Sequence, residues 1–195
     1  MRSQRVLTLV EIALTIALSA VLSLVAARLP INFAGGTISF AMLPILVLSL
    51  RRGVLAGAIA GLGFGVIDYL IEPFFVAYAQ VALDYGVAFA ALGLAGLGSA
   101  AYKSALKTSS RKAFLVAVPY LILGCVGRFA AAWLSGVIFF GQNAPAGQPV
   151  WLYSVIYNLS YIVPSLILCL VGAALVLPAL EAAVPSAPRS AVPAS

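Results

Sequence analysis

Long apolar runs of about 20 residues, separated by short polar connections, restrict the fold of this chain more than any other feature. The runs are rich in Ala, Leu, Gly and Val and lack the polar–apolar alternation of a barrel strand. Only 8% of the residues are charged, whereas a soluble domain carries about 25%. A bilayer tolerates so apolar a surface but admits only helices or closed barrels. The sequence therefore predicts an all-α, polytopic membrane protein.

Six transmembrane helices are predicted, at residues 6–27, 37–50, 54–70, 79–101, 114–140 and 151–177. They form one domain over residues 1–181, and the Ala/Pro/Ser-rich tail at 182–195 is expected to be disordered. The first run resembles a signal peptide, but Glu11 interrupts its apolar core and further spans follow at once, so we expect a retained helix. In the third span, small residues at four-residue spacing predict close helix packing: Gly57, Gly61 and Gly65.

The basic residues predict the orientation, because cytoplasmic loops of membrane proteins carry an excess of Lys and Arg. With both termini in the cytoplasm, nine of the eleven basic residues lie on that side; the exceptions are Arg28, outside, and Arg128, within a span. Lys103, Lys107 and the pair at 111–112 mark the most basic loop. The residues Asp68 and Glu72 mark an outer loop. Short clusters of this kind, without a continuous basic face, argue against nucleic acid as a partner.

Charged residues inside the spans are the first candidates for function, because a charge at mid-bilayer costs about 2.5–3.5 kcal/mol on insertion scales. They are Glu11, Asp84 and Arg128. Asp84 and several aromatic residues converge on the outer half of three helices, which favours a pocket for a small aromatic or cationic ligand. An equally open interpretation is that Asp84 pairs with Arg128 and the aromatics form an interfacial belt. Glu11 is close enough to the cytoplasmic end to reach the interface.

Catalysis finds little support in the sequence. There is no histidine, and Ser and Tyr have no Cys/His pair or paired carboxylates to activate them. No Walker A loop or dinucleotide-binding turn occurs, so any energy for uphill transport would come from a partner or an ion. Cys125 and Cys169 lie in apolar runs and predict neither a disulfide nor a metal site. We expect no enzyme activity, no metal and no cofactor.

Several segments are similar to one known family in order and spacing. They are 48–57 (LSLRRGVLAG), 80–89 (QVALDYGVAF), 128–140 (RFAAAWLSGVIFF), 144–145 (AP), 151–154 (WLYS) and 157–158 (YN). Together they resemble the thiamine-specific S component of energy-coupling factor (ECF) transporters, the ThiT family. The similarity extends from Glu11 to about Val176.

This resemblance implies a six-helix substrate-binding subunit in the bacterial plasma membrane. It would capture thiamine from outside and pass it inward through a transmembrane T component and two ATPase subunits. Ala13 and Ala17, a small-xxx-small pattern on the first helix, would contact the T component. The loop between the first two helices would act as a lid, with Gly35 in the lid and Ser39 at the second helix.

The resemblance also implies roles for residues of the site. Asp84 would face the cationic part of thiamine and Tyr85 would line the same wall. Phe140 would stack on the ligand, and Tyr153 and Asn158 would hydrogen-bond the pyrimidine. The remaining residues assigned to substrate binding are Trp133, Gln80 and Arg128. The family commonly has histidine immediately before the position of Trp133; here Ala132 would reshape one side of the pocket, or Trp133 would partly compensate.

Two other functions stay open from the residues. The chain could be an S component for another vitamin or for a thiamine precursor such as the pyrimidine moiety. It could also be a structural membrane protein without a small-molecule ligand.

Overall fold

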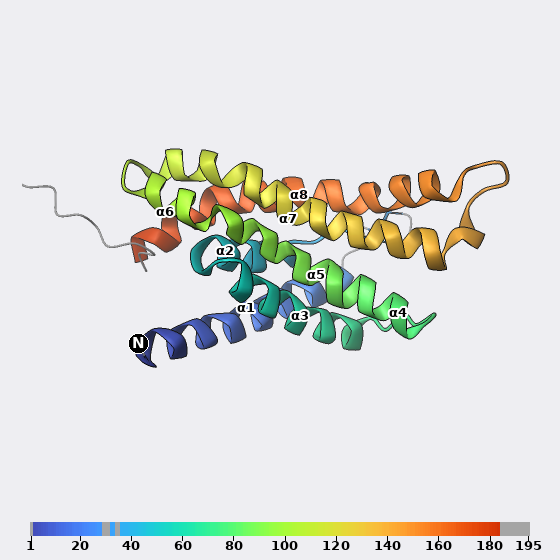
Figure 1. Cartoon of the computed structure of the whole chain (residues 1–195), viewed down its shortest axis with the longest axis horizontal. Coiled ribbons are helices and arrows are strands. Elements are labelled where there is room, and N and C mark those ends of the chain that lie inside the picture. Colours follow the sequence, from blue (N-terminus) through green and yellow to red (C-terminus); the bar gives the residue numbers. More distant parts are fainter. Residues whose placement is uncertain (1, 29–31, 34–35, 184–195) are drawn as a thin grey trace, which may run out of the picture.

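The structure is a computed structural model that describes residues 2–28, 32–33 and 36–183. Within this part, helices run side by side along an elongated bundle (Figure 1). The helices are α1 (Arg2–Arg28), α2 (Met42–Arg52), α3 (Val54–Ile71), α4 (Tyr78–Val81), α5 (Ala88–Ala90), α6 (Ser99–Leu106), α7 (Ser110–Phe139) and α8 (Val150–Ala183). The π-helical turn η1 (Ala82–Val87) and the 3₁₀ segments η2 (Ala91–Gly98) and η3 (Gly141–Asn143) complete them.

The segments from α4 to α6 join into one continuous rod, Tyr78–Leu106, which we call the 78–106 helix. The described residues therefore form six helical rods, as the sequence predicted. Five of them are long and apolar enough to cross a membrane. The sixth, α2, has 11 residues and spans about 16 Å, which is roughly half the thickness of the hydrocarbon core. Most of its residues are buried against the other helices.

The 78–106 helix lies at the centre of the arrangement, with α7 on one side and α3 on the other. Helix α8 packs on α7, and α1 packs on α3 and α2. The glycines of α3 allow this close packing, as predicted. A Cβ atom on Gly61 or Gly65 would lie 2.1 or 1.7 Å from the backbone oxygen of Phe89 or Tyr85, so only glycine fits there.

The predicted start of the second helix was wrong by five residues. Thr37 belongs to a short antiparallel pair of strands, β1 (Asn32–Phe33) and β2 (Gly36–Thr37), and α2 begins only at Met42. The backbone N–H of Ser39 donates to the Ser165 hydroxyl of α8 (3.1 Å), which holds the incoming chain in an extended form. Pro44 lies in the first turn of α2, where its missing N–H has no partner to lose.

Other predicted boundaries differ at the helix ends. Asp68, at the outer end of the span predicted over 54–70, lies in α3, which continues to Ile71, and it accepts a hydrogen bond from the hydroxyl of Ser23 (2.6 Å). The predicted basic loop is shorter than expected, because Lys103 lies in α6 and the pair at 111–112 lies in the first turn of α7. Helix α8 continues to Ala183; the rest of the predicted tail, with Arg189, is outside the described residues, as are Gly35 and most of the predicted lid.

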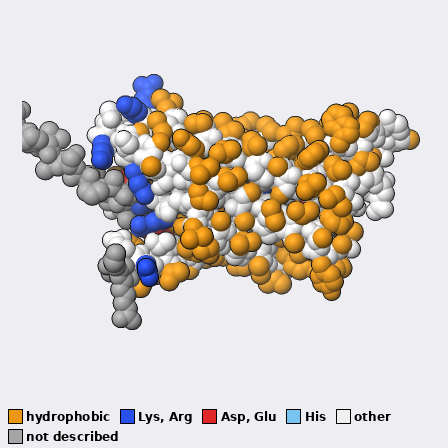
Figure 2. All heavy atoms as spheres, viewed as in Figure 1, with side chains coloured by type: hydrophobic (Ala, Val, Ile, Leu, Met, Phe, Trp, Pro, Cys, Tyr) orange, Lys and Arg blue, Asp and Glu red, His pale blue; other side chains and the backbone are white. Residues whose placement is uncertain are grey.

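The surface is banded. Lys and Arg side chains gather at one end of the bundle, at the left in Figure 2, and apolar side chains cover most of the length. We call these two regions the basic end and the apolar band. Many large side chains in the band are exposed, among them Leu14 (64%), Leu55 (74%) and Leu175 (72%). An apolar surface of this extent needs lipid around it, in agreement with a multi-pass membrane protein.

Candidate ligand-binding cavity

A cavity of about 570 Å³ lies toward the end of the bundle opposite the basic end. Its volume is in the range of small-molecule sites. Its walls come from the α3–α4 connection, the 78–106 helix, the second half of α7, the η3 turn and the first half of α8. They are lined by Glu72, Pro73, Phe74, Gln80, Asp84, Tyr85, Ala88, Arg128, Ala132, Gly136, Phe140, Asn143, Tyr153, Ser154, Tyr157, Asn158 and Tyr161.

The acidic side of the cavity is built on the 78–106 helix. Asp84 is half-buried, and its Oδ2 accepts a hydrogen bond from Nε2 of Gln80 (2.7 Å), one helical turn earlier. Gln80 itself is 1% exposed. Asp84 and Tyr85 both lie in η1, the π-helical turn, a distortion often found at functional sites. The Asp84 carboxylate is thus held by a neutral amide that fixes its orientation without cancelling its charge.

Arg128 of α7 also lines the cavity, but it is not ion-paired with Asp84. Its guanidinium carbon lies 4.4 Å from the centre of the Phe89 ring, a cation–π contact. The ion pairs within 4.0 Å among the described residues are Arg51–Glu181 and Arg52–Glu11. The direct Asp84–Arg128 pair that the spacing had left open is therefore absent from the described structure.

Tyrosines form the wall contributed by α8. Tyr153, Tyr157 and Tyr161 follow one another at four-residue spacing, with ring centres 6.0 and 5.9 Å apart. Tyr157 and Tyr161 were not among the predicted binding residues, although their helical spacing from Tyr153 is a signal visible in the sequence. Phe74 and Phe140 also line the cavity, and their rings lie 5.8 Å apart and are tilted by 31°. Aromatic side chains therefore line the cavity from α8, from the end of α7 and from the α3–α4 connection.

Asn158 is 3% exposed and its amide is anchored within the protein. The Nδ2 group donates to the backbone oxygens of Ser154 (2.9 Å) and Ala132 (3.4 Å), while Oδ1 accepts from the hydroxyl of Tyr161 (2.6 Å). An amide oxygen has two lone pairs, so Oδ1 retains acceptor capacity for a donor group on a ligand. The carbonyl of Ala132 thus helps to position Asn158, although its methyl side chain offers no polar group.

The structure brings together Gln80, Asp84, Tyr85, Arg128, Phe140, Tyr153 and Asn158, which are seven of the eight predicted substrate-binding residues. Trp133 is the exception, because it is not among the lining residues. Its indole N–H instead donates to the backbone oxygen of Trp151 (3.2 Å), which ties α7 to the start of α8. Ser39 is also absent from the lining and contacts Ser165 instead.

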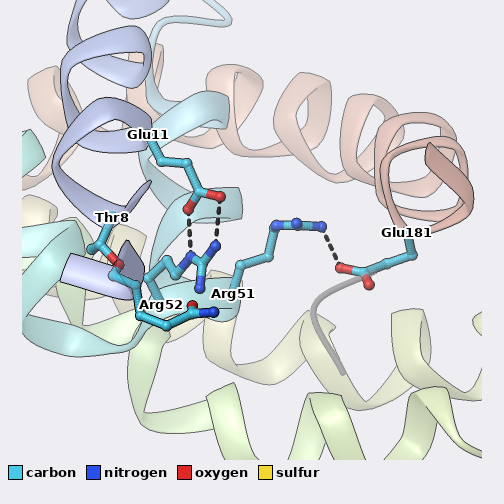
Figure 3. Close-up of polar contacts among 6 residues, drawn as sticks. Thr8, Glu11, Arg51, Arg52 and Glu181 are labelled. Carbon is cyan, nitrogen blue, oxygen red and sulfur yellow. Dashed lines mark hydrogen bonds and ion pairs between the residues drawn. The ribbon is translucent and has the colours of Figure 1, made fainter. Parts of the chain in front are cut away.

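The candidate residues of α1 lie away from the cavity. Ala13 and Ala17 are exposed on the surface of α1. Glu11 was predicted to reach the cytoplasmic interface; it forms a bidentate ion pair with Arg52, whose Nη2 lies 2.6 Å from Oε1 of Glu11 (Figure 3). The neighbouring Arg51 points the other way and pairs with Glu181 of α8 (2.5 Å).

An apolar bundle with a polar and aromatic cavity near one end defines a class: a multi-pass membrane protein that holds a small molecule. Comparison with known proteins is specific. Residues 9–184 match the family model described as "Thiamine transporter protein (Thia_YuaJ)". The chain belongs to this thiamine transporter family, as its resemblance had indicated, and the family is one of transporters rather than enzymes.

Individual relatives agree with this assignment. The thiamine transporter ThiT of Bacillus subtilis (strain 168) is 39% identical over 170 residues, which are 86% of this chain and 88% of the relative. ThiT of Lacticaseibacillus paracasei is 33% identical over 126 residues, 62% of this chain and 63% of the relative. A solved structure of ThiT from Listeria monocytogenes superposes with a TM-score of 0.80 at 25% identity, covering 90% of this chain and 96% of the other.

Proposed function

We propose that the cavity binds thiamine and that the chain is the substrate-binding S component of an ECF-type transporter. The observation that carries the proposal is the Asp84 carboxylate, which lines an aromatic cavity and is bonded to a neutral amide. Thiamine joins a cationic thiazolium ring to a neutral aminopyrimidine. A desolvated cation is attracted by a carboxylate and by aromatic faces, and both are present here.

The neutral ring would meet matching groups from the end of α7 and from α8. Oδ1 of Asn158 retains a lone pair for the pyrimidine amino group. Phe140 and Tyr153 also line the cavity, and the ring of Phe140 would stack on the ligand. Arg128 would repel the thiazolium and so would favour the orientation that brings this ring to Asp84.

The orientation in the membrane follows from the basic end. Since Lys and Arg are enriched on the cytoplasmic side, the basic end would face the cytoplasm together with both termini. The cavity would then lie in the outer half of the bilayer and receive thiamine from outside. The sequence contains no Walker A motif, so ATP hydrolysis would be supplied by partners, a T component and two ATPase subunits. Exposed Ala13 and Ala17 on α1 would allow close approach of a T-component helix.

A titration of the purified chain with thiamine, followed by tryptophan fluorescence or calorimetry, tests the proposal. Asp84→Asn keeps the shape of the side chain but removes its charge. We expect a loss of about 2–5 kcal/mol in binding free energy, which is at least about a thirtyfold rise in Kd. Glu72→Gln is the matched control, because Glu72 is an exposed carboxylate at the cavity rim; its effect should stay within about 1 kcal/mol.

Competition with hydroxymethylpyrimidine and riboflavin separates the other candidate ligands. Preference for a neutral ligand would leave Asp84 without its proposed partner. Unchanged thiamine affinity in Asp84→Asn would refute the role of the carboxylate. Absence of any vitamin-dependent thermal shift would favour a structural protein instead.

A further inference from the structure

The connection between α3 and α4, residues 72–77, forms part of the cavity rim and is held by side chains of the cavity itself. We call it the rim loop. Glu72, Pro73 and Phe74 all line the cavity. The hydroxyl of Tyr85 donates to the backbone oxygen of Glu72 (3.0 Å), and Phe74 lies against the ring of Phe140. Two wall residues therefore hold the first half of the rim loop.

A third anchor, Gln80, holds the second half. Its Oε1 accepts a hydrogen bond from the backbone N–H of Val76 (3.2 Å), while its Nε2 donates to Oδ2 of Asp84 (2.7 Å). The two ends of one buried amide thus bind two different parts of the site. The orientation of this amide is determined by its partners, because an N–H needs an acceptor and a carboxylate needs a donor.

We propose that Gln80 is a positioning residue that couples the rim loop to the Asp84 carboxylate, so that a cation on Asp84 and closure of the rim loop stabilise one another. The proposal rests on the proposed function for the identity of the cation, thiamine. The hydrogen bonds that link the rim loop to Asp84 through Gln80 are present without ligand and do not depend on the proposed function.

The coupling follows from the shared amide. A ligand that fixes the Asp84 carboxylate also restricts the rotamers of Gln80, so less conformational freedom remains to be lost when Val76 is held in place. The effect is reciprocal, because a closed rim loop keeps Gln80 in the rotamer that orients the carboxylate. Phe74 and Pro73, carried by the same loop, would then close over the ligand.

Hydrogen–deuterium exchange of backbone amides in residues 74–78 measures this link directly, since the N–H of Val76 is one of its bonds. Gln80→Met keeps the length of the side chain but removes both hydrogen-bonding groups. Without ligand, we expect exchange of the rim loop to rise by about 2- to 10-fold, the factor expected for one lost hydrogen bond. With saturating thiamine, the wild-type loop should be further protected, whereas Gln80→Met should show no added protection and weaker binding.

Two controls separate coupling from a general loss of packing. Gln142→Met makes the same change at an exposed glutamine of the other connection at this end, and it should leave exchange of residues 74–78 unaltered. Gln80→Glu keeps an acceptor for Val76 and, when its carboxyl group is ionised, has no donor for Asp84, so its exchange is measured at a pH at which this group is ionised. Its ligand-free exchange should stay near the wild-type rate while thiamine-dependent protection disappears. This variant also decides the matter if Gln80→Met fails to fold.

The proposal is overturned if Gln80→Met leaves ligand-free exchange of the rim loop unchanged, or raises that of residues 141–149 equally. It is also overturned if Gln80→Glu retains full protection by thiamine. Failure of the proposed function looks different: the wild-type protein would bind no thiamine, yet the ligand-free difference between Gln80→Met and wild type would persist.

Discussion

The two ion pairs at the basic end permit a sharp test of how burial determines the energy of a charge pair. Arg51 and Arg52 are consecutive, carry the same charge and pair with carboxylates on different helices (Figure 3). In the pair with Glu181, the two side chains are only 5% and 8% exposed. In the pair with Glu11, they are 22% and 20% exposed. The same substitution in each pair therefore compares a buried pair with a partly exposed one.

We predict that Glu181→Gln lowers the free energy of unfolding by about 3–5 kcal/mol, because it leaves the buried charge of Arg51 without its counter-charge. Glu11→Gln should cost about 1 kcal/mol, at the upper end for exposed pairs because its geometry is bidentate. The measurement is an unfolding titration with SDS in mixed micelles, followed by tryptophan fluorescence. Thiamine affinity should change little in either variant, since neither pair lines the cavity.

The sign of a double substitution tests the reasoning further. Replacing both members of the buried pair, as in Arg51→Met with Glu181→Leu, removes the desolvated charges together. This should be nearly neutral or stabilising relative to wild type, whereas each single change is costly. If Glu181→Gln cost no more than Glu11→Gln, or if the double variant were less stable than both single variants, burial would not be what determines the energy of this pair.

Two further predictions concern close helix packing. Gly65→Ala would place a Cβ 1.7 Å from the backbone oxygen of Tyr85, so it should shift the η1 turn, destabilise the protein by about 1–3 kcal/mol and weaken thiamine binding. Gly63→Ala meets only the end of a flexible side chain and should be neutral or slightly stabilising. Thermal unfolding and a thiamine titration compare the two variants. Ala17→Leu should prevent co-purification of the chain with a T component but leave thiamine affinity unchanged. Ala100→Leu, also at an exposed alanine but on α6, should change neither co-purification nor affinity.

The helices were predictable because the membrane leaves a clear signal in the sequence. Apolar runs and basic clusters located six rods, and most of their ends fell within a few residues. The start of α2 was missed because residues 37–41 are apolar enough to extend a span, yet they are held outside it by a strand pair and a contact to α8. The π-helical turn carrying Asp84 was not predicted; its backbone at Tyr85 packs closely on Gly65 of α3, a contact between segments about 20 residues apart that local sequence patterns do not reveal.

Within the site, the sequence located charges and aromatics but not the direction in which each side chain points. On α7, the residues that line the cavity follow one another at four-residue spacing, from Arg128 through Ala132 and Gly136 to Phe140. Trp133 is rotated by about 100° around the helix from Ala132, so it faces the start of α8 instead. The ion pairs at the basic end were not predicted, because their partners are 41 and 130 residues apart in the chain.

The preference for a cation that we propose for this cavity depends on the different partners of Asp84 and Arg128. Had Asp84 met Arg128 directly, the two charges would neutralise one another, and an entering cation would have to break a desolvated pair at a cost of several kcal/mol. Instead, Arg128 lies over the ring of Phe89, and Asp84 is held by the neutral amide of Gln80. Because Asp84 and Arg128 line the same cavity without pairing, the electric field inside it points from Arg128 toward Asp84. A ligand with one charged and one neutral ring would therefore have one favoured orientation there, with its cation toward Asp84.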